Sequence, residues 1–289
     1  MKIKVKITFM KKISFISYCC FLFYCSVHAQ FEEMVSDYDI LTTIAGKGEI
    51  DAGGINGWLE EYEGGLAIEA ELSRPHFAMA DNNNNIYIAD KDAHAIRMIQ
   101  PNGLIITVAG TSIAGDNGDG PATEHQLNSP NGIWVKEDGT VYILDLGNSK
   151  IRKLTTDGNL ETVVDDQGGI SLGRGLWVSQ DEDTIWYASG SQIKMWTSAG
   201  GITTYSSGFS SLGNITADIN GNIVATDRTA NLVYCVCADG SKEIIAGNGL
   251  SSGGGDGYKA LETGLHGVRG VWFLEDNSYL LATHEGSQV

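Results

Sequence analysis

Short apolar runs, separated by polar turns, repeat along most of the chain. Between residues 75 and 109 the runs are Pro75–Asp81, Ile86–Ala89, Ala95–Gln100 and Leu104–Ala109. They are rich in Ile, Val and Tyr and are divided by turn residues such as Pro101-Asn102-Gly103. Runs of this length with such boundaries are typical of β-strands. The pattern therefore predicts one small antiparallel sheet of four strands.

The same arrangement recurs further along the chain. Tyr142 follows Tyr87 by 55 residues. At the same spacing, Asp90, Ile96 and Arg97 of the first unit recur as Asp145, Ile151 and Arg152. Three further units begin at Gly173, Leu212 and Val268. A repeat of this length, in which turns rather than helices connect the strands, is typical of a β-propeller. Each sheet of a propeller is called a blade. We predict an all-β propeller of four-stranded blades.

One position in the first strand of the units holds a large residue in four of the five. Its occupants are Met79, Trp134, Trp177, Thr216 and Trp272. Stacked blades must fill the space between their sheets, so we expect this position to form the core between blades. The aspartates that end the second strands are likewise expected to be scaffold, because Asp hydrogen-bonds nearby backbone amides in turns.

Several motifs in these units resemble the NHL repeat of secreted propellers. They are Asp119-Gly120-Pro121-Ala122, Leu127-Asn128-Ser129-Pro130-Asn131-Gly132, Tyr142 to Arg152, and Tyr87 to Gly110. The resemblance is specific over residues 65–164 and weak over residues 169–249. It implies a ring of six blades. The chain supplies four complete blades and part of a fifth, so we expect residues 41–289 to be an NHL-type propeller truncated at its C-terminus.

The two ends of the predicted ring are related. Leu41–Gly46 matches Ile105–Gly110, the outermost run of the first unit, almost residue for residue. In a full ring it would be the outer strand of the last blade. Without that blade, both ends are exposed sheet edges.

The first 29 residues have the pattern of a signal peptide. Basic residues come first, residues 13–27 are apolar, and Val27-His28-Ala29 fits a small-x-small cleavage site. The apolar run is shorter than the ~20 residues that a membrane span needs. Met1 and Met10 both fit as the start. We predict cleavage before Gln30, a polar lead-in over residues 30–40, and a secreted, periplasmic or cell-surface protein.

Removing the leader makes an acidic chain more acidic. Its five lysines and no acidic residue change the formal charge from −17 to −22. Such a surface repels phosphate backbones and anionic lipid, so we expect no nucleic-acid partner and no membrane insertion after the leader is removed. Only Cys235 and Cys237 remain, and two cysteines two residues apart in a strand are not expected to form a disulfide.

Candidate ligand-binding residues lie at the start of each innermost strand. They are His76, Asn131, Arg174, Gly213 and Arg269. In a propeller these positions meet at one mouth of the central channel, where ligand sites are usually built. Most are polar and they differ between units, whereas the core positions stay alike. The alternative is that they are only solvated strand starts.

Three aspartates are candidate metal ligands. The loop 115–120, with Asp116 and Asp119, is similar to the start of a calcium loop, and Asp256 lies in a partial copy. A bidentate Glu is not at the expected distance. Because the segment also links blades, the alternative is a structural role. Calcium or another divalent cation is thus the cofactor hypothesis.

Two functions fit these residues. The first is a scaffold that binds a protein, peptide or glycan through the channel mouth and its loops. The second is a metal-assisted lyase or lactonase, in which His76, Arg174 and Arg269 would be the catalytic candidates together with a carboxylate still to be named. The chain has no phosphate loop and no Gly-x-Gly-x-x-Gly dinucleotide fingerprint. Because fold alone does not decide function, we favour binding and keep catalysis as the alternative.

Overall fold

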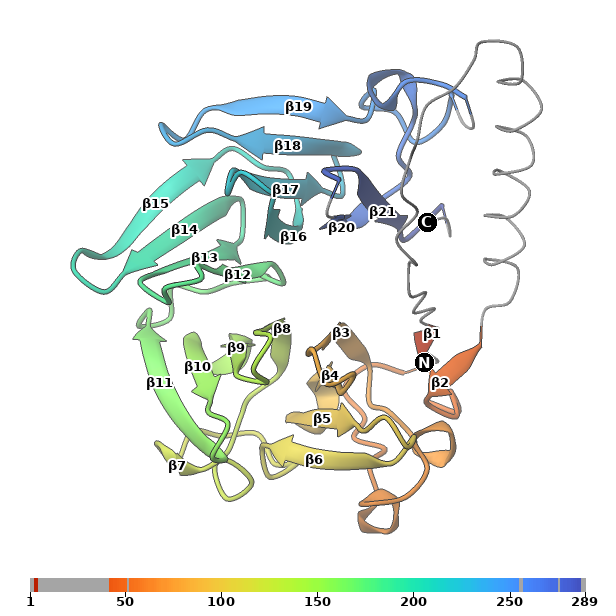
Figure 1. Ribbon diagram of the computed structural model, residues 1–289, viewed down its shortest axis with the longest axis vertical. Helices are drawn as coiled ribbons and strands as arrows, with labels where there is room; N and C mark the ends of the chain where they lie inside the picture. Colours follow the sequence, from red (N-terminus) through yellow and green to blue (C-terminus); the bar gives the residue numbers. More distant parts are fainter. Residues whose placement is uncertain (1–2, 5–41, 51, 255–256, 275, 287–289) are drawn as a thin grey trace, which may run out of the picture.

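Five sheets lie in an arc around one centre, as Figure 1 shows. This computed structural model describes residues 3–4, 42–50, 52–254, 257–274 and 276–286. Nearly all of the predicted signal peptide, the whole lead-in and Asp256 lie outside the described residues. Among the described residues, no helix is long and apolar enough to cross a membrane.

Four of the sheets are antiparallel blades, each with its strands in sequence order from the centre outwards (Figure 1). Blade 1 contains β3 (Pro75–Ala80), β4 (Ile86–Asp90), β5 (Ala95–Ile99) and β6 (Ile105–Ala109). Blade 2 contains β8 (Pro130–Val135), β9 (Val141–Asp145), β10 (Lys150–Leu154) and β11 (Asn159–Asp165), with β7 (Gly120–Pro121) added outside β11. Blade 3 contains β12 (Leu176–Val178), β13 (Thr184–Ser189), β14 (Gln192–Thr197) and β15 (Gly201–Ser207). Blade 4 contains β16 (Leu212–Ala217), β17 (Ile223–Asp227), β18 (Leu232–Val236) and β19 (Lys242–Ala246).

The fifth sheet is shorter. It pairs β20 (Val268–Phe273) with β21 (Tyr279–Thr283), and we refer to it as blade 5. The predicted four-stranded blades of an incomplete propeller are therefore confirmed. The described residues also form five short 3-10 turns: η1 (Glu60–Tyr62), η2 (Ala67–Glu69), η3 (Lys91–Ala93), η4 (Leu146–Asn148) and η5 (Ala260–Glu262).

The strand near the N-terminus lies beside blade 1. Thr43–Ala45 (β2) pairs with Ile3–Lys4 (β1), and Ala45 packs into the same buried cluster as Ile88 and Ile105. The prediction that residues 41–46 complete the last blade of a closed ring stays a prediction.

A buried aspartate at the end of the second strand anchors the start of blades 1, 2 and 4. Asp90 accepts a hydrogen bond from the Ser73 amide at 2.6 Å, and Asp227 accepts from the Ser210 amide at 2.6 Å. In blade 3 the hydroxyl of Ser189 replaces the carboxylate and accepts from the Ser171 amide at 3.1 Å. Each bond ties the end of the second strand to the loop that leads into the first. These contacts agree with a scaffold role for the aspartates.

The recurring tryptophans are not simply core between neighbouring blades. The ring of Trp134 in blade 2 lies 5.9 Å from that of Trp177 in blade 3, but also 6.1 Å from that of Trp272 in blade 5. Blades 2 and 5 are not neighbours, so this second contact crosses the central channel. Trp272 is 46 % exposed, whereas Thr216 at the same position in blade 4 is buried. The predicted core role holds for Thr216 and is wrong for Trp272.

Burial between blades sets the stability of the ring. Ile133 of β8 is fully buried between blades 1 and 2, whereas Ile219, in a turn of blade 4, is 59 % exposed. We expect Ile133→Ala to lower the free energy of unfolding by about 2–5 kcal/mol, because it leaves a cavity in a packed interface. The matched change Ile219→Ala should stay within about 0.5 kcal/mol. Urea denaturation measures both, and equal costs would show that the buried interface is not where the fold gains its stability.

Candidate ligand-binding site

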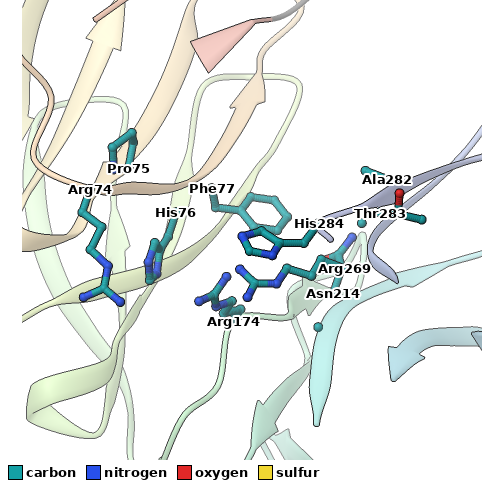
Figure 2. A pocket seen from close by; sticks show the side chains of 12 residues that line it. Arg74, Pro75, His76, Phe77, Arg174, Asn214, Arg269, Ala282, Thr283 and His284 are labelled. Atoms are coloured by element: carbon teal, nitrogen blue, oxygen red, sulfur yellow. The ribbon is translucent and has the colours of Figure 1, made fainter. Parts of the chain in front are cut away.

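A cavity of about 530 Å³ lies at one mouth of the central channel. Residues from blades 1, 3, 4 and 5 line it. Figure 2 shows how they converge, and they are Arg74, Pro75, His76, Phe77, Arg174, Gly213, Asn214, Arg269, Gly270, Ala282, Thr283 and His284. Its volume is in the range of small-molecule sites in proteins.

Close contact between the innermost strands brings these residues together. A Cβ atom added to Gly132 would lie 2.0 Å from the carbonyl oxygen of Arg174, and one added to Gly175 would lie 2.5 Å from the amide nitrogen of Ile215. Both are shorter than any normal contact, so only glycine allows these backbones to approach so closely. The strand starts of neighbouring blades therefore converge around the channel.

Where this glycine is replaced, the side chain lines the cavity. The third residue of the innermost strand is Gly132 in blade 2 and Gly270 in blade 5, and Gly175 takes the equivalent place just before β12 in blade 3. The same place holds Phe77 in blade 1 and Asn214 in blade 4. Both exceptions belong to the lining. The sequence analysis did not select them, although this break in the glycine pattern is visible in the sequence. His284 was also missed, and no repeat in the sequence signals it.

His76 is held in one tautomer by a buried asparagine. Oδ1 of Asn131 contacts Nδ1 of His76, and Nδ2 of Asn131 donates to the carbonyl oxygen of Gly173. An amide oxygen can only accept, so Nδ1 of His76 carries the proton and Nε2 keeps its lone pair. Burial, reinforced by the positive charge of Arg174, lowers the pKa of His76 to about 4. The imidazole is thus neutral at physiological pH and offers an acceptor to the cavity.

Two arginines bring positive charge to the cavity without an ion-paired carboxylate among the described residues. Burial and the nearby Arg269 lower the pKa of Arg174 to about 10, and burial and Arg228 lower the pKa of Arg269. No described residue forms a hydrogen bond or an ion pair with either side chain, whereas Nε of Arg228 donates to Glu285 at 2.8 Å. Figure 2 shows both guanidinium groups pointing into the cavity. Unpaired guanidinium groups of this kind favour an anionic ligand.

Asn214 adds an unsatisfied acceptor. Its Nδ2 donates to the carbonyl oxygen of Val271 at 2.9 Å, but its buried Oδ1 has no hydrogen-bond partner among the described residues. A buried acceptor without a partner costs about 1–3 kcal/mol. A donor from a ligand or from a bridging water would recover that cost.

The donor set does not fit a divalent metal. The described lining contains no Asp or Glu, and three of its side chains carry guanidinium groups. Within the described ranges, no group of three or more His, Cys, Asp or Glu side chains is placed to hold a metal ion. Hard cations prefer carboxylate and carbonyl oxygens. These residues therefore give no basis for a metal-assisted step at the mouth.

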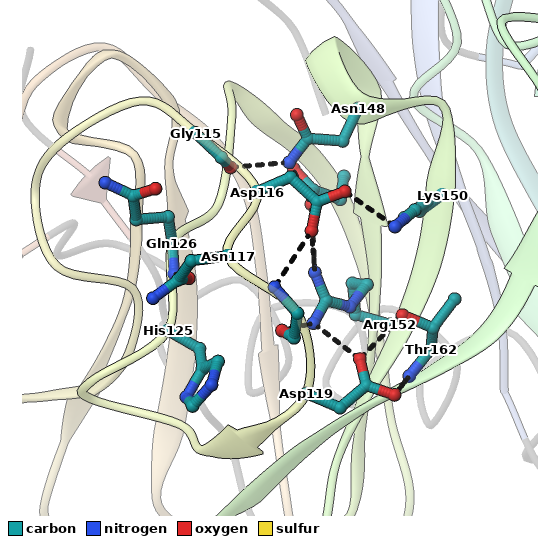
Figure 3. Close-up of polar contacts among 12 residues, drawn as sticks. Gly115, Asp116, Asn117, Asp119, His125, Gln126, Asn148, Lys150, Arg152 and Thr162 are labelled. Atoms are coloured by element: carbon teal, nitrogen blue, oxygen red, sulfur yellow. Dashed lines mark hydrogen bonds and ion pairs between the residues drawn. The ribbon is translucent and has the colours of Figure 1, made fainter.

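The aspartates of the calcium-like loop have cationic partners, as Figure 3 shows. Asp116 accepts from Lys150 at 2.6 Å, and Asp119 accepts from the buried Arg152 at 3.0 Å and from the Thr162 amide at 3.0 Å. These contacts attach the linker between blades 1 and 2 to β10 and β11. The structure thus gives both carboxylates a structural role, which was the alternative to a cation site. Asp256 lies outside the described residues.

Four of the five residues predicted to form the channel mouth line the cavity, and Asn131 does not. His76, Arg174, Gly213 and Arg269 all belong to the lining. Asn131 is 2 % exposed and lies behind His76, where it orients the imidazole. It is a positioning residue, and a role in direct ligand binding stays a prediction for the other four.

The tautomer of His76 can be tested by changing its partner. Asn131→Asp should raise the pKa of His76, because a carboxylate would then face Nδ1 and stabilise the imidazolium. Asn102→Asp adds the same charge in an exposed turn, keeps the acceptor for the Leu104 amide, and should leave His76 unchanged. ¹⁵N NMR titration of the imidazole measures both. In the unchanged protein, a pKa near the ordinary ~6.5 would contradict the account.

The lowered pKa of His76 also determines how the stability of the fold changes with pH. The folded-state pKa of about 4 lies below the unfolded value of about 6.5, so the unfolded chain binds the proton first as the pH falls. His76 therefore contributes stability above about pH 6.5 that is lost as the pH falls towards 4.

Comparison with known proteins gives several repeat-containing relatives. NHL repeat-containing protein 2 of Homo sapiens is 28% identical over 103 residues, which are 35% of this chain and 14% of that protein. Teneurin-4 of Mus musculus is 26% identical over 233 residues, which are 73% of this chain and 8% of the relative. The chain thus spans only a small part of the length of these relatives. No protein-family model matches it.

Solved structures share the fold at low identity. A structural genomics protein of unknown function from Bacteroides thetaiotaomicron has a TM-score of 0.63 at 14% identity, covering 84% of this chain and 58% of its own. An auxiliary nutrient binding protein from the same organism has a TM-score of 0.59 at 10% identity, covering 77% and 59%. A gluconolactonase from Xanthomonas campestris has a TM-score of 0.53 at 16% identity, covering 73% and 71%. These matches show that the chain has a β-propeller fold, and part of its sequence is similar to an NHL repeat-containing protein.

Proposed function

We propose that the chain is a binding propeller whose channel mouth captures an anionic group of a protein, peptide or glycan. The observation that carries this proposal is the pair Arg174 and Arg269. They come from blades 3 and 5, point into one cavity, and have no partner among the described residues. Leaving two guanidinium groups unpaired at a partly buried site is costly, and a bound anion removes that cost.

The charge of the rest of the chain makes the mouth selective. The formal net charge is −17, yet the described lining carries three arginines and no carboxylate. Long polyanions are repelled by the acidic surface, whereas a single anionic group needs only to reach the mouth. The similarity in fold to an auxiliary nutrient binding protein is compatible with a binding role.

A lyase or lactonase remains the second candidate, and one observation favours it. Nε2 of His76 keeps a lone pair beside Arg174, so it could take a proton next to a carbonyl or carboxylate that the guanidinium neutralises. The gluconolactonase of similar fold is in line with such chemistry. The first candidate is stronger because a pKa of about 4 makes His76 a weak base, and because the described mouth offers no carboxylate for a metal.

Binding through the arginines can be measured directly. We expect Arg174→Ala and Arg269→Ala each to weaken binding of an anionic ligand at least about tenfold, because hydrogen bonds to charged groups contribute about 1.5–3 kcal/mol. Lys259→Ala removes the same charge at an 83 % exposed site and should have no effect. Isothermal titration calorimetry with acidic and neutral glycans and peptides in solution gives the affinities. The proposal would be contradicted if both arginine variants bound every anion as tightly as the unchanged protein does.

We also propose that the protein is exported, and the only basis for this is its N-terminal leader. Basic residues, an apolar run and Val27-His28-Ala29 precede the propeller, and this order is what signal peptidases cut. Expression in a bacterial host should therefore yield a secreted or periplasmic protein whose N-terminus is Gln30. Mass spectrometry of the purified protein measures the N-terminus. A chain that keeps Met1 or Met10 in the cytoplasmic fraction would contradict this.

A further inference from the structure

We infer that the mouth recognises the terminal hexuronate residue of a glycan, a sugar ring that carries one carboxylate among several hydroxyl groups. This inference rests on the proposed binding function and names the ligand class for the same cavity. It depends on three features of the lining: the two unpaired arginines, the hydrogen-bond acceptors beside them, and an aromatic ring.

The arginines define where the carboxylate lies. Arg174 and Arg269 are close enough that their charges repel each other, and neither side chain forms an ion pair or a hydrogen bond with a described residue. A planar carboxylate between two guanidinium groups accepts two pairs of hydrogen bonds and cancels part of the repulsion. The nearby Arg74 is already opposed by Asp92 at 3.7 Å, so the unpaired charge is concentrated on the other two.

The acceptors define what surrounds the carboxylate. Nε2 of His76 has a lone pair, and Oδ1 of Asn214 is buried without a partner in the described part of the chain. Each is an acceptor that a hydroxyl group of the ligand or a bridging water would satisfy. Ammonium donors are disfavoured beside Arg174, which argues against free amino acids. Hydroxyl groups supply donors without charge, and a sugar acid carries several of them next to its carboxylate.

An apolar wall suits a sugar ring. Phe77 is half-buried and lines the cavity, and Figure 2 shows its ring within the group of side chains around the arginines. Aromatic rings present an apolar face on which the C–H groups of a pyranose can pack. An inorganic anion would leave this wall unused.

The acidic surface favours a terminal residue over an internal one. A polyuronate chain threaded across the mouth would bring many negative charges against a protein of formal charge −17. At about 0.1 M ionic strength this repulsion is felt over about 10 Å. A glycan that ends in one uronate and continues with neutral sugars avoids it.

The test is calorimetric titration of the full chain with methyl β-glucuronide and three matched probes. These are methyl β-glucoside, which lacks the carboxylate, an N-acetylated dipeptide with a free C-terminus, and inorganic phosphate. We expect the glucuronide to bind at least about tenfold more tightly than each probe, a ratio equivalent to one good charged contact. Arg174→Gln and Arg269→Gln should remove the difference between glucuronide and glucoside, and Lys259→Ala should keep it. Circular dichroism confirms that each variant is folded.

The outcomes separate this inference from the proposed function. If the dipeptide or phosphate binds as tightly as the glucuronide and the arginine variants lose that binding, the mouth is an anion site and the hexuronate inference is wrong. If no anion shows binding that depends on Arg174 or Arg269, the proposed function fails as well. Equal binding of glucuronide and glucoside also overturns the inference, because the carboxylate would then contribute nothing.

Discussion

Close backbone contact between the innermost strands is the constraint on which the site depends. At Gly132 and Gly175 a single added carbon would collide with the backbone of the next blade. The blades can therefore converge at the channel only because these positions lack a side chain. The same convergence brings the residue before each glycine to one mouth. Fold and site thus share one cause, since the packing that closes the blades around the channel also gathers Arg174 and Arg269.

The ionic contacts of the propeller divide into two kinds. Arg97 and Arg152 are fully buried and are compensated by Asp90 and Asp119, and they hold strands and linkers together. Arg174 and Arg269 have no such partner among the described residues. In a chain with almost twice as many acidic as basic residues, 36 against 19, two unpaired arginines in one cavity are better explained by a ligand than by the scaffold.

Most of the fold could be predicted from the sequence, because blades repeat and repetition makes their strands and turns easy to align. The strand starts could be predicted to meet for the same reason. The contact between Trp134 and Trp272 could not, because it joins blades that are far apart in the sequence and depends on the radius of the channel. Nor could the unsatisfied Oδ1 of Asn214 or the tautomer of His76, since both depend on which neighbours lie within hydrogen-bonding distance.

The most direct test of the central claim is a crystal structure of the full chain soaked with methyl β-glucuronide. The account predicts that the carboxylate lies within hydrogen-bonding distance of both guanidinium groups, with a hydroxyl group on Nε2 of His76. A structure in which an aspartate or glutamate of the protein itself pairs with Arg174 and Arg269, leaving no room for the ligand, would contradict it.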